Sequence, residues 1–162
     1  MTTAKEWIEK LQLLPHPEGG FFRETYRSEA MENFDGFRGL RSVCTGIYFM
    51  LTQGRFSAFH RIKSDEMWHF YAGDPVEIFW IDHDTTLHQI QLGINLNKGQ
   101  VPQAVVPTGC WFGSRVLAGG KFSLAGCTVA PGFDFEDFEM ADRVELMHTY
   151  PQHEEIIRAL TR

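Results

Sequence analysis

The sequence predicts an all-β protein, in which roughly eight to ten short strands form a sandwich or barrel with short helices at both ends. Runs of β-branched and aromatic residues recur between turn residues from residue 43 to residue 129. Aromatic residues make up 14% of the chain, and Phe alone accounts for 14 positions, which favours strands over helices. With 162 residues, the chain is expected to form one domain over residues 1–162.

The first expected element is a short helix. Residues 3–6, Thr-Ala-Lys-Glu, fit a capping box, and an apolar stripe follows them. That stripe is formed by Trp7, Ile8 and Leu11. Pro15 and Pro17 are expected to end the helix. Residues 16–20, His-Pro-Glu-Gly-Gly, are then predicted to be a tight connection whose role is backbone geometry.

Alternation and turn residues place the strands. They are expected over residues 21–27, 43–51, 56–62, 66–72, 76–81, 86–92, 103–106, 111–117 and 121–129. Residues 28–40 carry Ser, Asn, Asp and Gly and are predicted to be a loop. After a Phe-rich segment expected to be a core or dimer patch, helices are predicted over 143–148 and 152–160.

Composition excludes several classes of partner. The chain has 15 Lys and Arg against 21 Asp and Glu, and no basic block that would neutralise a phosphate backbone, so nucleic acid is not expected. No segment approaches the ~20 apolar residues that a membrane span needs. The N-terminal residues lack the apolar region of a signal peptide. Three Cys without metal-type spacing are expected to be reduced thiols, and the predicted location is the cytoplasm.

The motif that points to function lies in the middle of the chain. It has the pattern G-x5-H-x-I-x3-E-x6-G, and its defined positions are Gly54, His60, Ile62, Glu66 and Gly73. This spacing suits a hairpin with a His on one strand and an acid at the start of the next.

Strand alternation predicts which side chains share a face of that hairpin. His60 and Ile62 lie two residues apart and point the same way, as do Glu66, Trp68 and Phe70. The hairpin is therefore expected to bring His60 and Glu66 together inside the barrel.

The motif resembles the first signature of the cupin superfamily, G-x5-H-x-H-x3,4-E-x6-G, with Ile62 in place of the second His. The second cupin signature, G-x5-P-x-G-x2-H-x3-N, is half present. Pro107 and Gly109 match it, whereas its first Gly, its His and its Asn are replaced by Val101, Phe112 and Val116. The chain is also similar to an uncharacterised cupin branch with four further motifs. Those motifs are His16–Gly20, Phe22–Tyr26, Trp68–Tyr71 and Val129–Phe133.

The resemblance implies a cupin-type antiparallel β-barrel, or jelly roll, that pairs into homodimers. Cupin metal sites typically use three His and one Glu. Carrying these positions over leaves only His60 and Glu66, because Ile62 and Phe112 cannot coordinate a metal. No cofactor is therefore expected beyond a weakly bound divalent metal. His69 would complete such a site only through a β-bulge, because alternation turns it to the opposite face, where a hydrogen bond within the sheet or a subunit contact is expected.

The favoured prediction is an organic pocket. His60 and Glu66 are expected at its floor as the catalytic pair, with His60 as the acid–base group, and the predicted walls are Ile62, Trp68, Phe70 and Phe112. Arg23 is expected to hold an anionic ligand at the mouth, or else to form an edge-strand salt bridge. Tyr48 is expected to point its hydroxyl into the pocket, or else to pack. The remaining histidines are expected at the surface, namely His16, His83, His88, His148 and His153.

These residues indicate a site for a small polar metabolite, such as a sugar or keto acid, with metal-independent isomerase or epimerase chemistry. Metal-free cupins such as the dTDP-4-dehydrorhamnose 3,5-epimerases use a barrel His in this way. Three alternatives remain open: a non-catalytic ligand-binding module, a metal-dependent cupin enzyme with an incomplete His/Glu ligand set, and a buried His60–Glu66 pair that only stabilises the hairpin.

Overall fold

A computed structural model describes residues 2–162 of the chain. Its strands are β1 (Leu14–Pro15), β2 (Phe21–Arg27), β3 (Met31–Asn33), β4 (Leu40–Ser42), β5 (Thr45–Thr52), β6 (Phe56–Arg61), β7 (Asp65–Gly73), β8 (Val76–Ile81), β9 (Leu87–Leu92), β10 (Gln103–Val106), β11 (Trp111–Val116), β12 (Phe122–Ala130) and β13 (Glu139–Met140). Its helices are α1 (Ala4–Leu11), α2 (Arg143–Thr149) and α3 (Glu154–Ala159), with short 3-10 turns η1 (Leu96–Lys98), η2 (Phe135–Asp137) and η3 (Pro151–His153).

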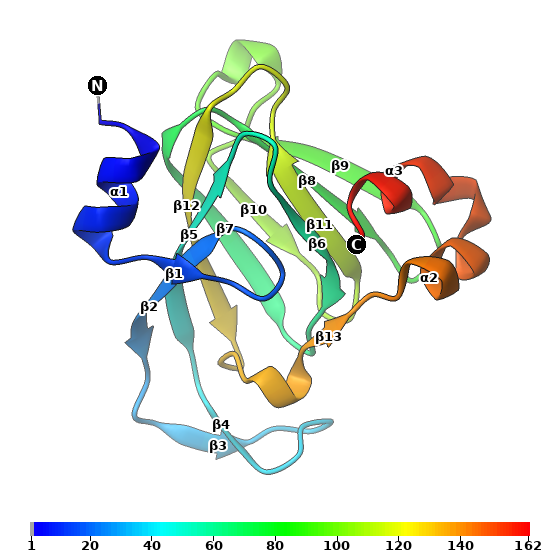
Figure 1. The fold of residues 1–162 in the computed structure, drawn as a ribbon. Coiled ribbons are helices and arrows are strands. Elements are labelled where there is room, and N and C mark those ends of the chain that lie inside the picture. The colour runs from blue at the N-terminus through cyan, green and yellow to red at the C-terminus, as the bar shows by residue number, and fades with distance from the viewer. Residues whose placement is uncertain (1) are drawn as a thin grey trace.

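All strands but β3 and β4 form two antiparallel sheets that face each other (Figure 1). One sheet has the order β1-β2-β5-β12-β7-β10, and the other has the order β13-β6-β11-β8-β9. Strands distant in sequence are neighbours in both sheets, as in the pairing of β12 with β5 and β7. The all-β prediction with terminal helices is confirmed.

Residues 28–40 are not a plain loop as the sequence predicted. They include β3, which pairs with β4 in a separate two-stranded hairpin, with Met31 opposite Ser42. Every residue of β3 is exposed. The apolar–polar alternation that reveals a half-buried strand is therefore absent from this hairpin, and polarity alone suggested a loop.

The capping box of α1 is confirmed. The Thr3 N–H donates to the Glu6 carboxylate at 2.7 Å, and the Glu6 N–H donates to Thr3 Oγ1 at 3.3 Å. The helix ends at Gln12, whose φ of 54° is left-handed, so it stops before the two prolines. Its apolar stripe packs against Met50 and Leu124 on the outer face of the six-stranded sheet.

The main core lies between the sheets and includes Phe49, Trp68, Ile78 and Phe112, each at most 2% exposed. A second cluster joins the outer face of the five-stranded sheet to α2 and α3. Each sheet is thus covered on both faces over part of its area. No helix among residues 2–162 is long and apolar enough to cross a membrane.

Candidate functional site

A cavity of about 240 Å³ opens at the end of the barrel where β6 and β12 finish and β5 and β7 begin. Its acidic and basic lining residues are His16, Glu18, Glu24, Arg27, His60, Glu66 and Asp134. Its apolar lining residues are Phe22, Ile47, Ile62, Val129, Phe133 and Phe135. The sequence-predicted residues His60, Glu66 and Ile62 therefore do share one cavity.

The partner of His60 is Glu18, which the sequence analysis assigned only to a turn. The distance from His60 Nε2 to Glu18 Oε2 is 2.9 Å, and both side chains are buried. The other ring nitrogen, Nδ1, donates to the backbone oxygen of Ala58 at 2.7 Å. A carbonyl oxygen only accepts, so Nδ1 carries a proton and the second proton lies between Nε2 and the carboxylate.

Charge and burial act against each other in this pair. Burial disfavours the charged form of His60, but the charge and hydrogen bond of Glu18 outweigh burial and raise the pKa of His60. Burial likewise disfavours the Glu18 carboxylate, but the charge and hydrogen bond of His60 prevail and lower the pKa of Glu18. Both shifts favour the imidazolium–carboxylate form of the pair.

The turn that supplies Glu18 enters the barrel because it is rich in glycine. A Cβ on Gly19 would lie 2.1 Å from the Phe56 oxygen, and one on Gly20 would lie 2.6 Å from the Met50 oxygen. Both glycines have positive φ, of 114° and 74°. Only glycine combines that conformation with so close an approach to β5 and β6.

His16 lies in the same turn and is not at the surface, contrary to the prediction. Its side chain is 6% exposed, and its ring packs edge-on against Phe22 at a centroid distance of 4.6 Å. The Glu18 N–H donates to His16 Nδ1 at 3.2 Å, which leaves the ring proton on Nε2. Burial lowers the pKa of His16, with the charge of Glu18 opposing that shift, so the ring is neutral.

Glu66 is 8% exposed and has no ion-pair partner among residues 2–162. Burial, with the nearby charge of Glu18, raises the pKa of Glu66 to about 7, against the opposing effect of His60 and of a hydrogen bond from Cys127. Burial and the charge of Glu66 raise the pKa of the Cys127 thiol well above its usual range. Cys127 is therefore a neutral thiol, whereas Glu66 can gain or lose a proton near neutral pH.

Two rings enclose the imidazole of His60. Phe112 lies at a centroid distance of 4.1 Å, and Phe138 stacks at 5.3 Å with an interplanar angle of 30°. Phe112 thus adjoins the cavity through His60, close to its predicted place. Phe133 and Phe135 line the cavity itself, where the sequence predicted a core or dimer patch.

Two other predicted wall residues lie away from this cavity. Trp68 is 1% exposed and packs against Phe49 at a centroid distance of 5.5 Å, in the core between the sheets. Phe70 borders a separate open depression with Gly73 and Gln91. Alternation placed both residues correctly on the inner face, but it does not show how far along the barrel the free space extends.

Arg23 and Tyr48 point to the outer face, so their predicted places at the cavity are wrong. Arg23 Nη1 donates to the Leu11 oxygen at 3.2 Å, and Tyr48 lies against Tyr71 at 6.1 Å beside α1. Arg27 lines the cavity instead.

A register shift in β2 explains why Arg27 faces the cavity. Glu24 is opposite Ile47, but Tyr26 is opposite Gly46, so Thr25 is an extra residue in the ladder. The bulge reverses the alternation and turns Arg27 inward. No signal in the sequence marks this bulge.

His69 points away from His60 and Glu66, as alternation predicted. Its Nε2 lies 3.0 Å from Thr128 Oγ1, and Gln103 Nε2 lies 3.1 Å from its Nδ1. Among residues 2–162, no three His, Cys, Asp or Glu side chains are placed to hold a metal ion together. The residues present do not fit the cupin metal site. In addition, Glu18 and the Ala58 oxygen occupy both ring nitrogens of His60, so neither is free to bind a metal.

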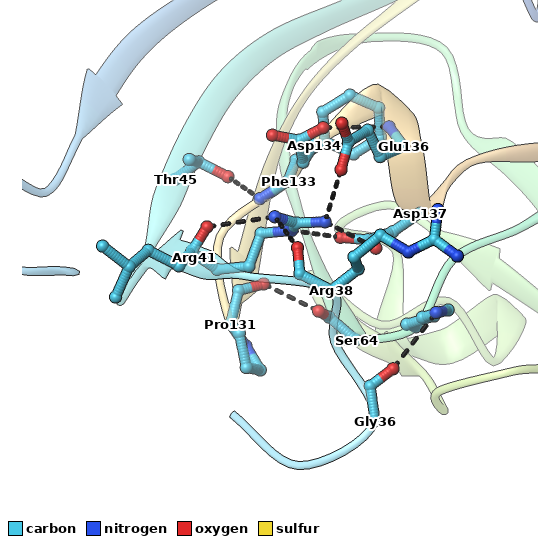
Figure 2. Close-up of polar contacts among 12 residues, drawn as sticks. Gly36, Arg38, Arg41, Thr45, Ser64, Pro131, Phe133, Asp134, Glu136 and Asp137 are labelled. Atoms are coloured by element: carbon cyan, nitrogen blue, oxygen red, sulfur yellow. Dashed lines mark hydrogen bonds and ion pairs between the residues drawn. The ribbon is translucent and has the colours of Figure 1, made fainter. Parts of the chain in front are cut away.

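Phe133 and Phe135 form an aromatic wall of the cavity, and the segment that carries them contacts the β3–β4 hairpin (Figure 2). Arg41, on β4, pairs with Asp137 at 2.7 Å and with Glu136 at 3.2 Å in η2. The Phe133 N–H donates to Thr45 Oγ1 at 2.9 Å. These contacts hold the segment from Phe133 to Asp137 over the open end of the barrel.

Comparisons with known proteins find similar proteins in three organisms. Over 99% of both chains, the structure matches a hypothetical protein from Leishmania major with a TM-score of 0.93 and 38% sequence identity. It matches protein SO0799 from Shewanella oneidensis over 100% of this chain and 99% of that one, with a TM-score of 0.91 and 44% identity. The uncharacterized protein YML079W of Saccharomyces cerevisiae is 30% identical over 149 residues, which are 84% of this chain and 74% of the yeast protein.

A family model described as Cupin superfamily (DUF985) matches residues 5–141. The match includes the hairpin of His60 and Glu66, the turn of Glu18 and the aromatic wall. The jelly-roll arrangement of the two sheets agrees with it. The chain belongs to the cupin superfamily, in the family DUF985.

Proposed function

We propose that the protein binds a small polar metabolite in the cavity and catalyses a metal-independent isomerisation or epimerisation through proton transfer. The observation that carries the proposal is Glu66, a buried carboxyl group with a pKa of about 7 that lines the cavity beside the His60–Glu18 ion pair. Acid–base groups work best when their pKa lies near the operating pH. The cupin fold supports either a small-molecule-binding or an enzymatic domain.

The proposed step is balanced without an oxidant or a cofactor. The Glu66 carboxylate takes the proton from a carbon next to a carbonyl group, and the electron pair of that C–H bond moves into an enolate. The Glu66 carboxyl group returns the proton to a neighbouring atom on the same face, which completes an isomerisation. In an epimerisation, a water molecule protonates the opposite face of the same carbon, and the resulting hydroxide takes the proton from Glu66.

In this proposal Glu66, rather than His60, exchanges the proton with the substrate. Both ring nitrogens of His60 are engaged by Glu18 and Ala58, so neither is free to exchange a proton with the substrate. The charge of His60 is offset by Glu18, so stabilisation of the enolate falls to hydrogen-bond donors in the cavity. The neutral His16 adds an Nε2–H as a hydrogen-bond donor in the same cavity.

Solvent deuterium exchange tests the proposal even when the product is unidentified. Carbonyl metabolites are incubated with the protein in D₂O, and loss of the α-proton signal is followed by NMR. We expect exchange of at least one compound with the wild type and a loss of about 100-fold or more with Glu66→Gln. The matched control is Glu77→Gln, because Glu77 is also 8% exposed but pairs with Arg115 outside the cavity. Equal exchange by both variants would refute the catalytic role of Glu66.

A non-catalytic binding module is the second candidate. This candidate is favoured because both ring nitrogens of His60 already have protein partners. Glu66 is then the one acid–base group at the floor of the cavity that is available to a substrate. Such a module would be stabilised by a metabolite through mass action, yet would show no deuterium exchange in that metabolite. Thermal shifts with the same panel of compounds therefore separate the two candidates.

A further inference from the structure

Two of the four acidic side chains around the cavity are already matched by bases. Glu18 is paired with His60 at 2.9 Å. Arg27 donates through both Nε and Nη2 to the Glu24 carboxylate, each at 2.8 Å. These four side chains contribute no net charge to the site.

The other two acids are unmatched. Glu66 is 8% exposed and lines the cavity without an ion-pair partner among the described residues. Asp134 accepts the Glu136 N–H at 2.9 Å as the cap of η2, and it has no ion-pair partner within residues 2–162. Arg27 and Arg41 lie near enough to feel its charge, but both are already bonded to other carboxylates. A negative charge therefore remains at the floor and at the mouth of the cavity.

Aromatic rings line the same cavity as these two acids. Phe133 and Phe135 meet edge to face at a centroid distance of 4.9 Å, and Phe22 lines the same cavity. Phe135 is 53% exposed, although it is a large apolar side chain. The face of an aromatic ring attracts a cation, and several rings around one space form the cage that binds ammonium groups.

We propose that the cavity binds a small organic cation, an ammonium or quaternary ammonium compound of about eight non-hydrogen atoms, between Glu66, Asp134 and the aromatic rings. The size follows from the volume of about 240 Å³, which equals about eight water molecules at roughly 30 Å³ each. The inference rests on the proposed function of the same cavity and names its ligand class.

The side chains present do not favour an anionic ligand. Within residues 2–162, Arg27 is the one arginine that lines the cavity, and its Nη2 donates to the Phe133 oxygen at 3.0 Å as well as to Glu24. An anion would have to displace Glu24 and would then lie near Asp134. Arg23, the arginine expected from the sequence to hold an anion, is on the outer face.

Titration calorimetry with probes of equal shape and different charge tests this inference. Choline is compared with its neutral isostere 3,3-dimethylbutan-1-ol and its anionic counterpart 3,3-dimethylbutanoate, and butylammonium is compared with butan-1-ol. We expect at least one cation to bind about tenfold more tightly than its neutral partner. Tighter binding of the neutral or anionic probes, or no detectable binding of either cation, would overturn the inference.

A charge-neutralising variant locates the cation. Asp134→Asn keeps an oxygen that can cap η2, so the fold should persist. We expect it to weaken binding of the cation about threefold or more and to leave the neutral probe unchanged. Asp84→Asn removes the same charge from an exposed turn between β8 and β9 and serves as the control. Equal losses of cation affinity in the two variants would mean that the net charge of the protein, and not a contact with Asp134, attracts the cation.

The pH dependence gives a second, independent measurement. Glu66 is faced by Glu18, His60 and Cys127, and it loses its proton near pH 7. Affinity for a cation should therefore rise from about pH 6 to pH 8, and the Glu66→Gln variant should lose that rise. An unchanged rise in Glu66→Gln would overturn the assignment of the cation to this acid. Deuterium exchange in neutral or anionic compounds would leave the proposed function intact while the cation preference failed.

Discussion

The chemistry of this protein is concentrated in three buried side chains, Glu18, His60 and Glu66. Two of them neutralise each other, and the third retains a pKa close to neutrality because burial and the Glu18 charge disfavour its ionised form.

Glu18→Gln should lower the pKa of His60. The carboxylate is the main influence that holds the imidazole in its charged form against burial. With Gln in its place, His60 should lose its second proton at least one pH unit lower than in the wild type, since one pKa unit corresponds to about 1.4 kcal/mol. Nitrogen-15 NMR of the imidazole measures this pKa. An unchanged His60 titration would mean that Glu18 is not its charge partner in solution.

Glu66→Gln should change how stability depends on pH. The folded pKa of Glu66, about 7, lies above its usual value of 4.5, so the folded state binds the extra proton between these values. The wild type therefore loses stability as the pH rises from about 4.5 to 7, and the Gln variant avoids that loss. The free energy of unfolding of the variant, relative to that of the wild type, should therefore rise by roughly 1–3 kcal/mol from pH 5 to pH 8. Urea unfolding at several pH values measures this difference. A difference that does not vary with pH would contradict the raised pKa.

At the scale of elements, short irregular segments decide which side chains reach the cavity. The turn of residues 16–20 inserts Glu18 and His16 between β5 and β6, and the bulge at Thr25 turns Arg27 inward. The segment that carries Phe133 and Phe135 is held over the opening by Arg41 (Figure 2). Regular strands supply only His60, Glu66 and part of the apolar wall.

Gly20→Ala should be much more destabilising than Gly36→Ala. Both glycines have positive φ, 74° and 84°, so both substitutions carry the same conformational strain, on the order of 1 kcal/mol. At Gly36 the new methyl group has no atom within 4 Å, whereas at Gly20 it meets the Met50 oxygen at 2.6 Å. Urea unfolding of both variants measures the difference. Equal losses of stability would indicate that the turn does not press against β5 as described.

At the scale of the whole molecule, the two sheets enclose a core along most of their length and leave one end hollow. The hollow has no set of ligands for a metal among residues 2–162, because hydrocarbon side chains occupy two cupin ligand positions. The homodimer and the cytoplasmic location stay predictions from the sequence.

Protein purified without a His tag should contain well under one equivalent of transition metal. Elemental analysis by mass spectrometry measures the content. A stoichiometric metal that disappears in His60→Ala would contradict this expectation, because it would require His60 to exchange its protein partners for a metal. Metal retained in that variant would have to be bound elsewhere.

The sequence by itself determined the all-β architecture, most strand positions, the capped first helix and the approach of His60 to Glu66. These features depend on period-two alternation, turn residues and the spacing of one hairpin, which are local properties of the chain. The same alternation correctly turned His69 away from Glu66.

Only the tertiary structure decided the remainder of the site. Glu18 is 42 residues before His60 in sequence, and no local pattern shows that a glycine turn carries it 2.9 Å from that ring. Arg23 lies before the bulged residue and faces outward by plain alternation, whereas Arg27 lies after it and is turned inward, because adding one residue to a strand reverses every later side chain. The free space depends on how side chains from both sheets fill the barrel, and packing of that kind is a property of the assembled core and not of any one segment.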